Sequence, residues 1–139
     1  MPNVLVVANR TAECEELQQA LTDRAAKGDD PKFTLVVPSA HGFAKAANPD
    51  EELPEAQRHV DNAVAKLRNA GLDVEGRLGD PDPVAAVQDA HNAGTYEEVI
   101  VSTLPTHLSK WLRVDLPRKA AHATGLPVTH VAGTPAPAT

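Results

Sequence analysis

The chain has 139 residues, enough for one domain with a hydrophobic core, and its 42% content of hydrophobic residues argues against a disordered protein. A formal net charge of −6 and an aromatic content of 3% argue against a basic nucleic-acid-binding surface and against stacking platforms for single strands. One cysteine excludes an intrachain disulfide, and no apolar stretch approaches the length of a membrane span, so we expect a cytoplasmic protein that binds neither nucleic acid nor membrane.

Two continuous apolar runs in the first part of the chain, Val4–Ala8 and Phe33–Val37, predict strands that are buried on both faces of a parallel sheet. Between them, a helix is expected to begin after an N-cap at Thr11 and to end near Gly28. Its inward face follows from spacings of three and four residues and comprises Cys14, Leu17, Leu21 and Ala25. Cys14 is therefore expected to be a small core residue.

The middle of the chain opens with its longest irregular stretch, a loop over 39–53. Apolar residues at helical spacing over 56–67 then predict a second helix. The segment Leu72–Leu78 alternates apolar and polar side chains, which is typical of a strand near the edge of a sheet with one wet face. The next turn leads into a third helix, with Asp82 expected as its N-cap and Pro83 as its first residue.

The last part of the chain contains a fourth buried strand at Glu98–Ser102 and a final strand at Pro127–Val131. Between these strands lie a polar segment over 103–113, with a short helical pattern, and a helix from Pro117 to Gly125. Five strands thus alternate with four helices, which predicts an α/β fold with a five-stranded parallel sheet and helices on both faces.

We expect a single domain over 1–132, followed by a flexible tail over 133–139 that is rich in Pro, Ala and Thr. In open parallel sheets, ligands bind outside the carboxyl ends of the strands, where the strand order reverses. The loops over 8–11, 37–53, 79–83 and 102–117 are therefore the places to look for a site.

Three stretches together resemble the universal stress protein family: the first strand, the Gly79-Asp80-Pro81 turn before an Ala/Val-rich helix, and the end of the chain from Glu98 to Val131. The resemblance covers nearly the whole chain and implies a sheet of order 3-2-1-4-5. It also implies a homodimer in which the last strands pair, here through Val128, Thr129, His130 and Val131. An uncharged edge strand is a liability unless it is paired, so this assembly makes physical sense.

The ATP-binding branch of that family carries a Gly-x-x-Gly…Gly-Ser/Thr loop, whose glycines let backbone N–H groups approach the phosphates. At the corresponding positions this chain has Thr103, Thr106, Leu116 and Pro117. The acidic residue usual after the first strand is Asn9, followed by Arg10-Thr11, and Pro38 stands after the second strand. These departures imply that ATP is not bound in the usual way, and we expect no cofactor.

Residues of these loops can nevertheless have a ligand-binding role or a purely structural one. The basic groups after the fourth strand can bind an anion, or they can be the solvated side of an amphipathic lid. The residues after the first strand can contact a ligand, or they can simply form a turn and a cap. The candidate binding residues are Asn9, Arg10, Thr11, Pro38, Thr103, Thr106, His107, Arg113, Leu116 and Arg118.

No catalytic or metal-ligating residue is assigned, because neither a Gly-x-Ser-x-Gly elbow nor a His-x-x-x-His spacing occurs. The favoured hypothesis is a regulatory or binding protein of the universal stress type, a homodimer active in a stress response. The alternative is a non-standard binder of ATP or AMP, with slow ATP hydrolysis as its enzymatic extreme. A third hypothesis is an unrelated small enzyme on the same scaffold, since a fold does not determine a function.

Overall fold

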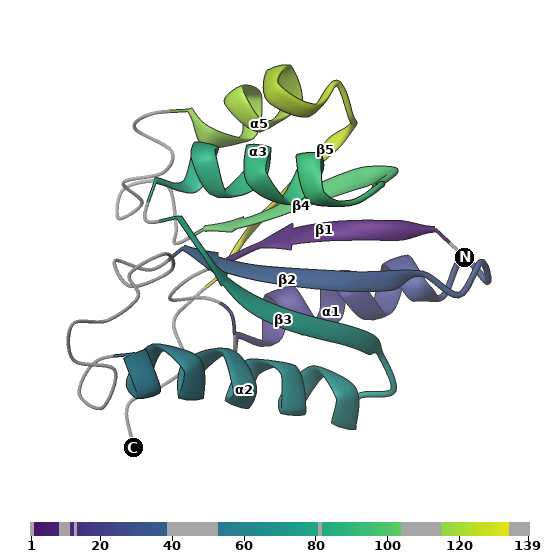
Figure 1. The fold of residues 1–139 in the computed structure, drawn as a ribbon. Helices are drawn as coiled ribbons and strands as arrows, with labels where there is room; N and C mark the ends of the chain where they lie inside the picture. The colour runs from purple at the N-terminus through teal and green to yellow at the C-terminus, as the bar shows by residue number, and fades with distance from the viewer. Residues whose placement is uncertain are drawn as a thin grey trace.

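The computed structural model describes residues 2–8, 12, 14–38, 53–80, 82–103 and 115–133, which form a parallel sheet between two layers of helices (Figure 1). The elements in chain order are β1 Asn3–Val7, α1 Glu15–Ala25, β2 Lys32–Pro38, α2 Leu53–Asn69, β3 Asp73–Gly79, α3 Pro83–Ala93, β4 Glu98–Thr103, α5 Leu116–Thr124 and β5 Val128–Ala132. The strands pair in parallel in the order β3-β2-β1-β4-β5. The predicted α/β fold and strand order are confirmed.

The central strand β1 divides the core into two halves. Val4 and Val6 are fully buried on the side of α1 and α2, where they meet apolar residues of both helices. Leu5 and Val7 are fully buried on the opposite side, with α3 and α5. A strand between two helix layers needs apolar side chains at every position, which explains its continuous apolar run.

The start of α1 differs from the prediction. The helix begins at Glu15, and its N-cap is Cys14, whose Sγ accepts a hydrogen bond from the Leu17 N–H at 3.4 Å. The predicted cap at Thr11 is therefore wrong, although Thr11 itself lies outside the described residues. Thiols are weak acceptors and are not among the favoured caps, so the pattern pointed to the nearest hydroxyl instead.

The other helix ends follow the sequence more closely. Asp82 caps α3 by accepting the Val84 N–H at 3.0 Å, and Pro83 is the first residue of that helix, as predicted. The end of α5 at Gly125, which has a left-handed φ of 69°, is also confirmed. The loop over 39–52, the polar segment over 104–113 with its short helical pattern, and the tail over 134–139 lie outside the described residues.

The edge strand β3 has the predicted wet face. Asp73, Glu75 and Arg77 are exposed, whereas Val74 is buried. Among the helices of the described ranges, none is long and apolar enough to cross a membrane.

Candidate functional site

The strand order reverses between β1 and β4, since α1 leads from β1 to β2 on one side while β4 lies on the other (Figure 1). A ligand of an open parallel sheet is expected outside the carboxyl ends of these two strands. The described residues at this end of the sheet include Ala8, Ala12, Cys14, Pro38, Gly79, Asp80, Ser102, Thr103, Leu116 and Gly133. We call this set of strand ends the carboxyl edge.

The last residue of β4, Thr103, connects the carboxyl edge to the outer strand. Its side chain is 2% exposed, and its Oγ1 lies 2.6 Å from Nε2 of His130 on β5. Its carbonyl oxygen accepts a hydrogen bond from the Gly133 N–H at 2.8 Å. Thr103 thus joins the end of β4 to β5 through both its side chain and its backbone.

On the opposite face of the sheet, Cys14 lies against the chain as it leaves β5. A Cβ placed on Gly133 would come within 2.6 Å of the Cys14 Sγ, so only glycine fits there without a shift. Burial raises the pKa of the Cys14 thiol, and hydrogen bonds from the Leu17 N–H and with Ser102 oppose that rise only in part. The thiol is therefore protonated at neutral pH and unreactive, as expected for a core cysteine.

The start of α5 is built differently from a phosphate-binding helix. Asp115 stands at the N-cap in a left-handed conformation, φ 55°, and its exposed side chain makes no capping hydrogen bond. Leu116, the first helical residue, is fully buried in the core, and Pro117 after it has no N–H to donate. An exposed carboxylate and a proline both make this helix start a poor place for a phosphate.

Four of the sequence-predicted site residues are described. Thr103, Leu116 and Arg118 lie at the end of β4 and the start of α5, and Pro38 is the buried last residue of β2. The side chain of Leu116 belongs to the core, and that of Arg118 is exposed. The other six lie outside the described residues, and their roles stay predictions: Asn9, Arg10, Thr11, Thr106, His107 and Arg113.

The two carboxylates at the end of β3 have structural partners. The Asp80 carboxylate accepts the Asp82 N–H at 2.8 Å, while Asp82 caps α3. Turn and cap therefore explain this pair. In the parts of the chain that the structure describes, no three His, Cys, Asp or Glu side chains lie close enough to hold a metal ion.

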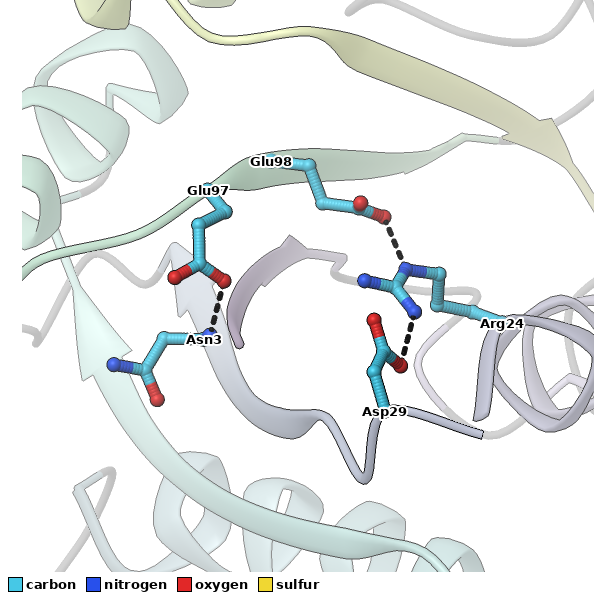
Figure 2. A network of polar contacts seen from close by, with 5 residues as sticks. All are labelled: Asn3, Arg24, Asp29, Glu97 and Glu98. Carbon is cyan, nitrogen blue, oxygen red and sulfur yellow. Dashed lines mark hydrogen bonds and ion pairs between the residues drawn. The ribbon is translucent and has the colours of Figure 1, made fainter. Parts of the chain in front are cut away.

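The opposite, amino end of the sheet carries a polar network that sequence patterns did not indicate (Figure 2). Arg24 of α1 donates to Asp29 at 2.8 Å and to Glu98 of β4 at 3.0 Å, with a side chain that is 11% exposed. The Asn3 N–H donates to the Glu97 carboxylate at 2.9 Å. The guanidinium lowers the pKa of Asp29, and the two carboxylates raise that of Arg24.

A hollow of about 270 Å³ also lies at the amino end, between the α1–β2 and α2–β3 turns. Its lining comprises Ala25, Asp30, Pro31, Phe33, Gly71, Leu72 and Asp73. It lies away from the carboxyl edge, where a fold of this type holds its ligands. Its open shape indicates a surface depression between two turns, and we do not place the site there.

The sequence matches no family model, and no curated protein matches it. Solved structures do resemble this chain. A universal stress protein from Archaeoglobus fulgidus has a TM-score of 0.66 at 15% identity, over 94% of this chain and 93% of that one. A universal stress protein in complex with cAMP also has a TM-score of 0.66, at 18% identity over 96% of this chain and 98% of the other.

A third similar structure is the Archaeoglobus fulgidus universal stress protein in complex with dAMP, with a TM-score of 0.62 at 19% identity, over 94% of this chain and 97% of that one. At such identities the similarity concerns the fold. The chain therefore has the universal stress protein fold over nearly its whole length, and the resemblance predicted from its sequence is confirmed at that level.

Proposed function

We propose that this chain is a cytoplasmic regulatory or ligand-binding protein of the universal stress type, which works as a homodimer and does not bind ATP in the usual way. The observation that carries this proposal is the start of α5. A glycine loop must turn several backbone N–H groups toward the phosphates. Here Asp115 adds an exposed carboxylate, Leu116 is buried, and Pro117 has no N–H.

The end of β4 supports the same conclusion. Thr103 stands at the first glycine position of the family's loop, and its branched side chain is buried, with the hydroxyl bonded to His130. A glycine at this position would leave room for a phosphate to approach the backbone, and a threonine fills that room. The carboxyl edge would then suit a ligand without a triphosphate.

The homodimer is supported by the outer strand. β5 is the last strand of the sheet, and Val128–Ala132 contains no Lys, Arg, Asp or Glu. Thr129, His130 and Ala132 are exposed. Since an uncharged edge strand tends to pair with another strand, a second copy of the chain is the partner we propose.

A second candidate function is a non-standard adenine-nucleotide binder, with slow ATP hydrolysis as its enzymatic extreme. It is favoured by the solved structures of the same fold that hold cAMP and dAMP. Such a protein would hold an anion through side chains, with Arg118 available at the start of α5.

Two measurements distinguish these functions. The purified protein is denatured and any released small molecule is identified by mass spectrometry, and thermal unfolding is followed with millimolar ATP, ADP, AMP or cAMP. We expect neither a bound adenine nucleotide nor a shift in Tm. A ligand present at about 100 times its Kd stabilises the native state by about 2.7 kcal/mol, which gives a shift of several degrees, so binding would be visible.

A shift with ATP would overturn the proposal and favour the second candidate. In that case Arg118→Ala should reduce the shift. Lys27→Ala is the matched control, because it removes one positive charge from an exposed site after α1, at the other end of the sheet. Equal shifts in both variants would exclude Arg118 as an anion ligand.

A further inference from the structure

His130 occupies the middle of the outer strand. It is exposed, and it is the one titratable side chain of Val128–Ala132. Its ring is held in place, because Nε2 lies 2.6 Å from Oγ1 of Thr103 on the neighbouring strand. By strand alternation it shares a face of the sheet with Val128, which packs on the side of α3 and α5.

Pairing of β5 with its own copy would bring the two His130 side chains together by symmetry. A twofold axis between antiparallel strands of one sheet runs perpendicular to that sheet, so each residue faces one on the same side. Full overlap of the five-residue strand places His130 directly opposite its counterpart. A slip by two residues in either direction leaves the two histidines diagonal neighbours, about 7–8 Å apart.

From this placement we infer that His130 makes the homodimer sensitive to pH: the dimer forms when the imidazole is neutral and weakens when both imidazoles are protonated. This inference rests on the proposed homodimer through β5. Histidine is the residue type whose charge changes in the physiological pH range, so the dimer is compared at pH values on either side of neutrality. Thr103 can serve both forms of the ring, because its hydroxyl donates to a neutral nitrogen and accepts from a protonated one.

Among the described residues, no acidic side chain forms an ion pair with His130, whose hydrogen bond goes to Thr103. On its face of the sheet, β4 contributes Val99, Val101 and Thr103, none of which titrates near neutral pH. The titratable groups of the packed helices are Asp115, Arg118, Lys119 and His122 on α5, and Glu15 and Glu16 at the start of α1 across the sheet. None of these side chains forms an ion pair with His130 in the described ranges, so no carboxylate in direct contact there offsets the repulsion between two protonated rings.

The expected effect is moderate. In an opposite or diagonal pair the two Cβ atoms would be roughly 5–8 Å apart, and the charged rings would be exposed to water. Repulsion at that distance corresponds to a dimer that is about three- to tenfold weaker at low salt. A general effect acts in the opposite direction: the net charge of −6 at pH 7 falls on acidification, so two copies repel each other less.

The test therefore compares the wild type with His130→Gln, whose amide can still bond to Thr103. The dimer Kd is measured by sedimentation velocity at pH 8.0 and pH 5.5 in low salt. We expect the ratio of the two Kd values to be at least about threefold larger for the wild type than for His130→Gln. His122→Gln is the matched control on α5, which should keep the wild-type ratio.

A second measurement does not depend on any variant. Because the dimer disfavours the proton, the pKa of His130 must be lower in concentrated than in dilute protein, which NMR titration of the ring can follow. A dimer with equal Kd ratios in the wild type and His130→Gln, or with a His130 pKa independent of concentration, would overturn the inference and leave the homodimer intact. A monomer at every concentration and pH would overturn both.

Discussion

The two edges of the sheet are built in opposite ways. β3 carries three exposed charged side chains, Asp73, Glu75 and Arg77, and Glu75 approaches Lys32 of the next strand at 3.6 Å. β5 has no such charge over Val128–Ala132. Charges on an edge strand discourage pairing with another chain, so β3 is protected and β5 is open.

The helices on the two edges reinforce this contrast. α2 runs along β3 (Figure 1), and it approaches so closely that a Cβ on Gly76 would lie 2.6 Å from Val64 Cγ2 and 2.7 Å from Val60 Cγ1. β5 instead contacts α1 and α5 and leaves Thr129 and His130 exposed. The difference between the edges indicates that β3 ends the sheet and that β5 is where it can be extended.

The largest effect is expected from a charge on the open edge. Thr129→Asp puts a carboxylate into the strand pair, and a symmetric dimer contains it twice. At about 1.4 kcal/mol for each copy, the Kd should rise roughly a hundredfold, as measured by light scattering or sedimentation. Asn62→Asp on the exposed side of α2 is the control with the same new side chain and should leave the Kd unchanged. Equal Kd values for the two variants would exclude β5 as the interface.

The next effect concerns the closed edge. Gly76→Ala forces a methyl group against Val60 and Val64, and overpacking of this kind costs about 1–3 kcal/mol. Urea unfolding should show the loss. Val64→Ala should lower the free energy of unfolding less in the Gly76→Ala variant than in the wild type. The smaller alanine side chain at position 64 leaves room for the new methyl group at position 76. If the losses in free energy of unfolding from the two substitutions are strictly additive, close packing of α2 against β3 is absent at this glycine.

Much of the fold could be predicted because its signals are local. The continuous apolar run of β1 reflects a strand with two buried faces, and the alternation of β3 reflects a strand with one buried face. Both patterns predicted the burial correctly. The cap of α1 was predicted wrongly because Cys14 serves as N-cap through a weak acceptor that the pattern does not rank. Tertiary burial, which brings Cys14 against Gly133, is invisible in the local sequence.

For the site, the sequence predicts its position in the fold but not the contacts of its side chains. Parallel strands bring their carboxyl ends together, so Pro38 and Thr103 could be assigned to one end of the sheet from the strand pattern alone. The partner of Thr103 could not, because His130 lies 27 residues further on and shares no periodicity with it. The same holds for Arg24 and Glu98, which are 74 residues apart.

A smaller effect is expected from removing the charges that discourage β3 from pairing with another chain. The double change Glu75→Thr and Arg77→Thr removes two exposed charges from β3 and introduces a residue that favours strands. Stability should fall by roughly 1–1.5 kcal/mol, because Arg77 donates a hydrogen bond to the Tyr96 hydroxyl at 3.2 Å, whereas the exposed Glu75–Lys32 ion pair contributes little. Species larger than a dimer should nevertheless appear in light scattering at high concentration, because both edges are then able to pair. An unchanged size distribution would mean that α2, and not charge, protects β3.

The smallest effect concerns the attachment of α1 to β4, the strand next to the open edge (Figure 2). Arg24→Gln removes the contacts to Asp29 and Glu98 and should cost about 1 kcal/mol at pH 7 in urea unfolding. Arg58→Gln, on the exposed side of α2, is the matched control and should cost less.

The cost of Arg24→Gln should depend on pH in a definite direction. The pKa of Asp29 is lower in the folded protein than in the unfolded chain, so this contact stabilises fully above the unfolded pKa of about 3.9. Its contribution is lost as the pH falls through the lower folded pKa, where the native carboxylate also takes up a proton. The difference between wild type and variant should therefore shrink below about pH 4. A difference that persists there would show that Arg24 acts through packing of its largely buried stem and not through its charge.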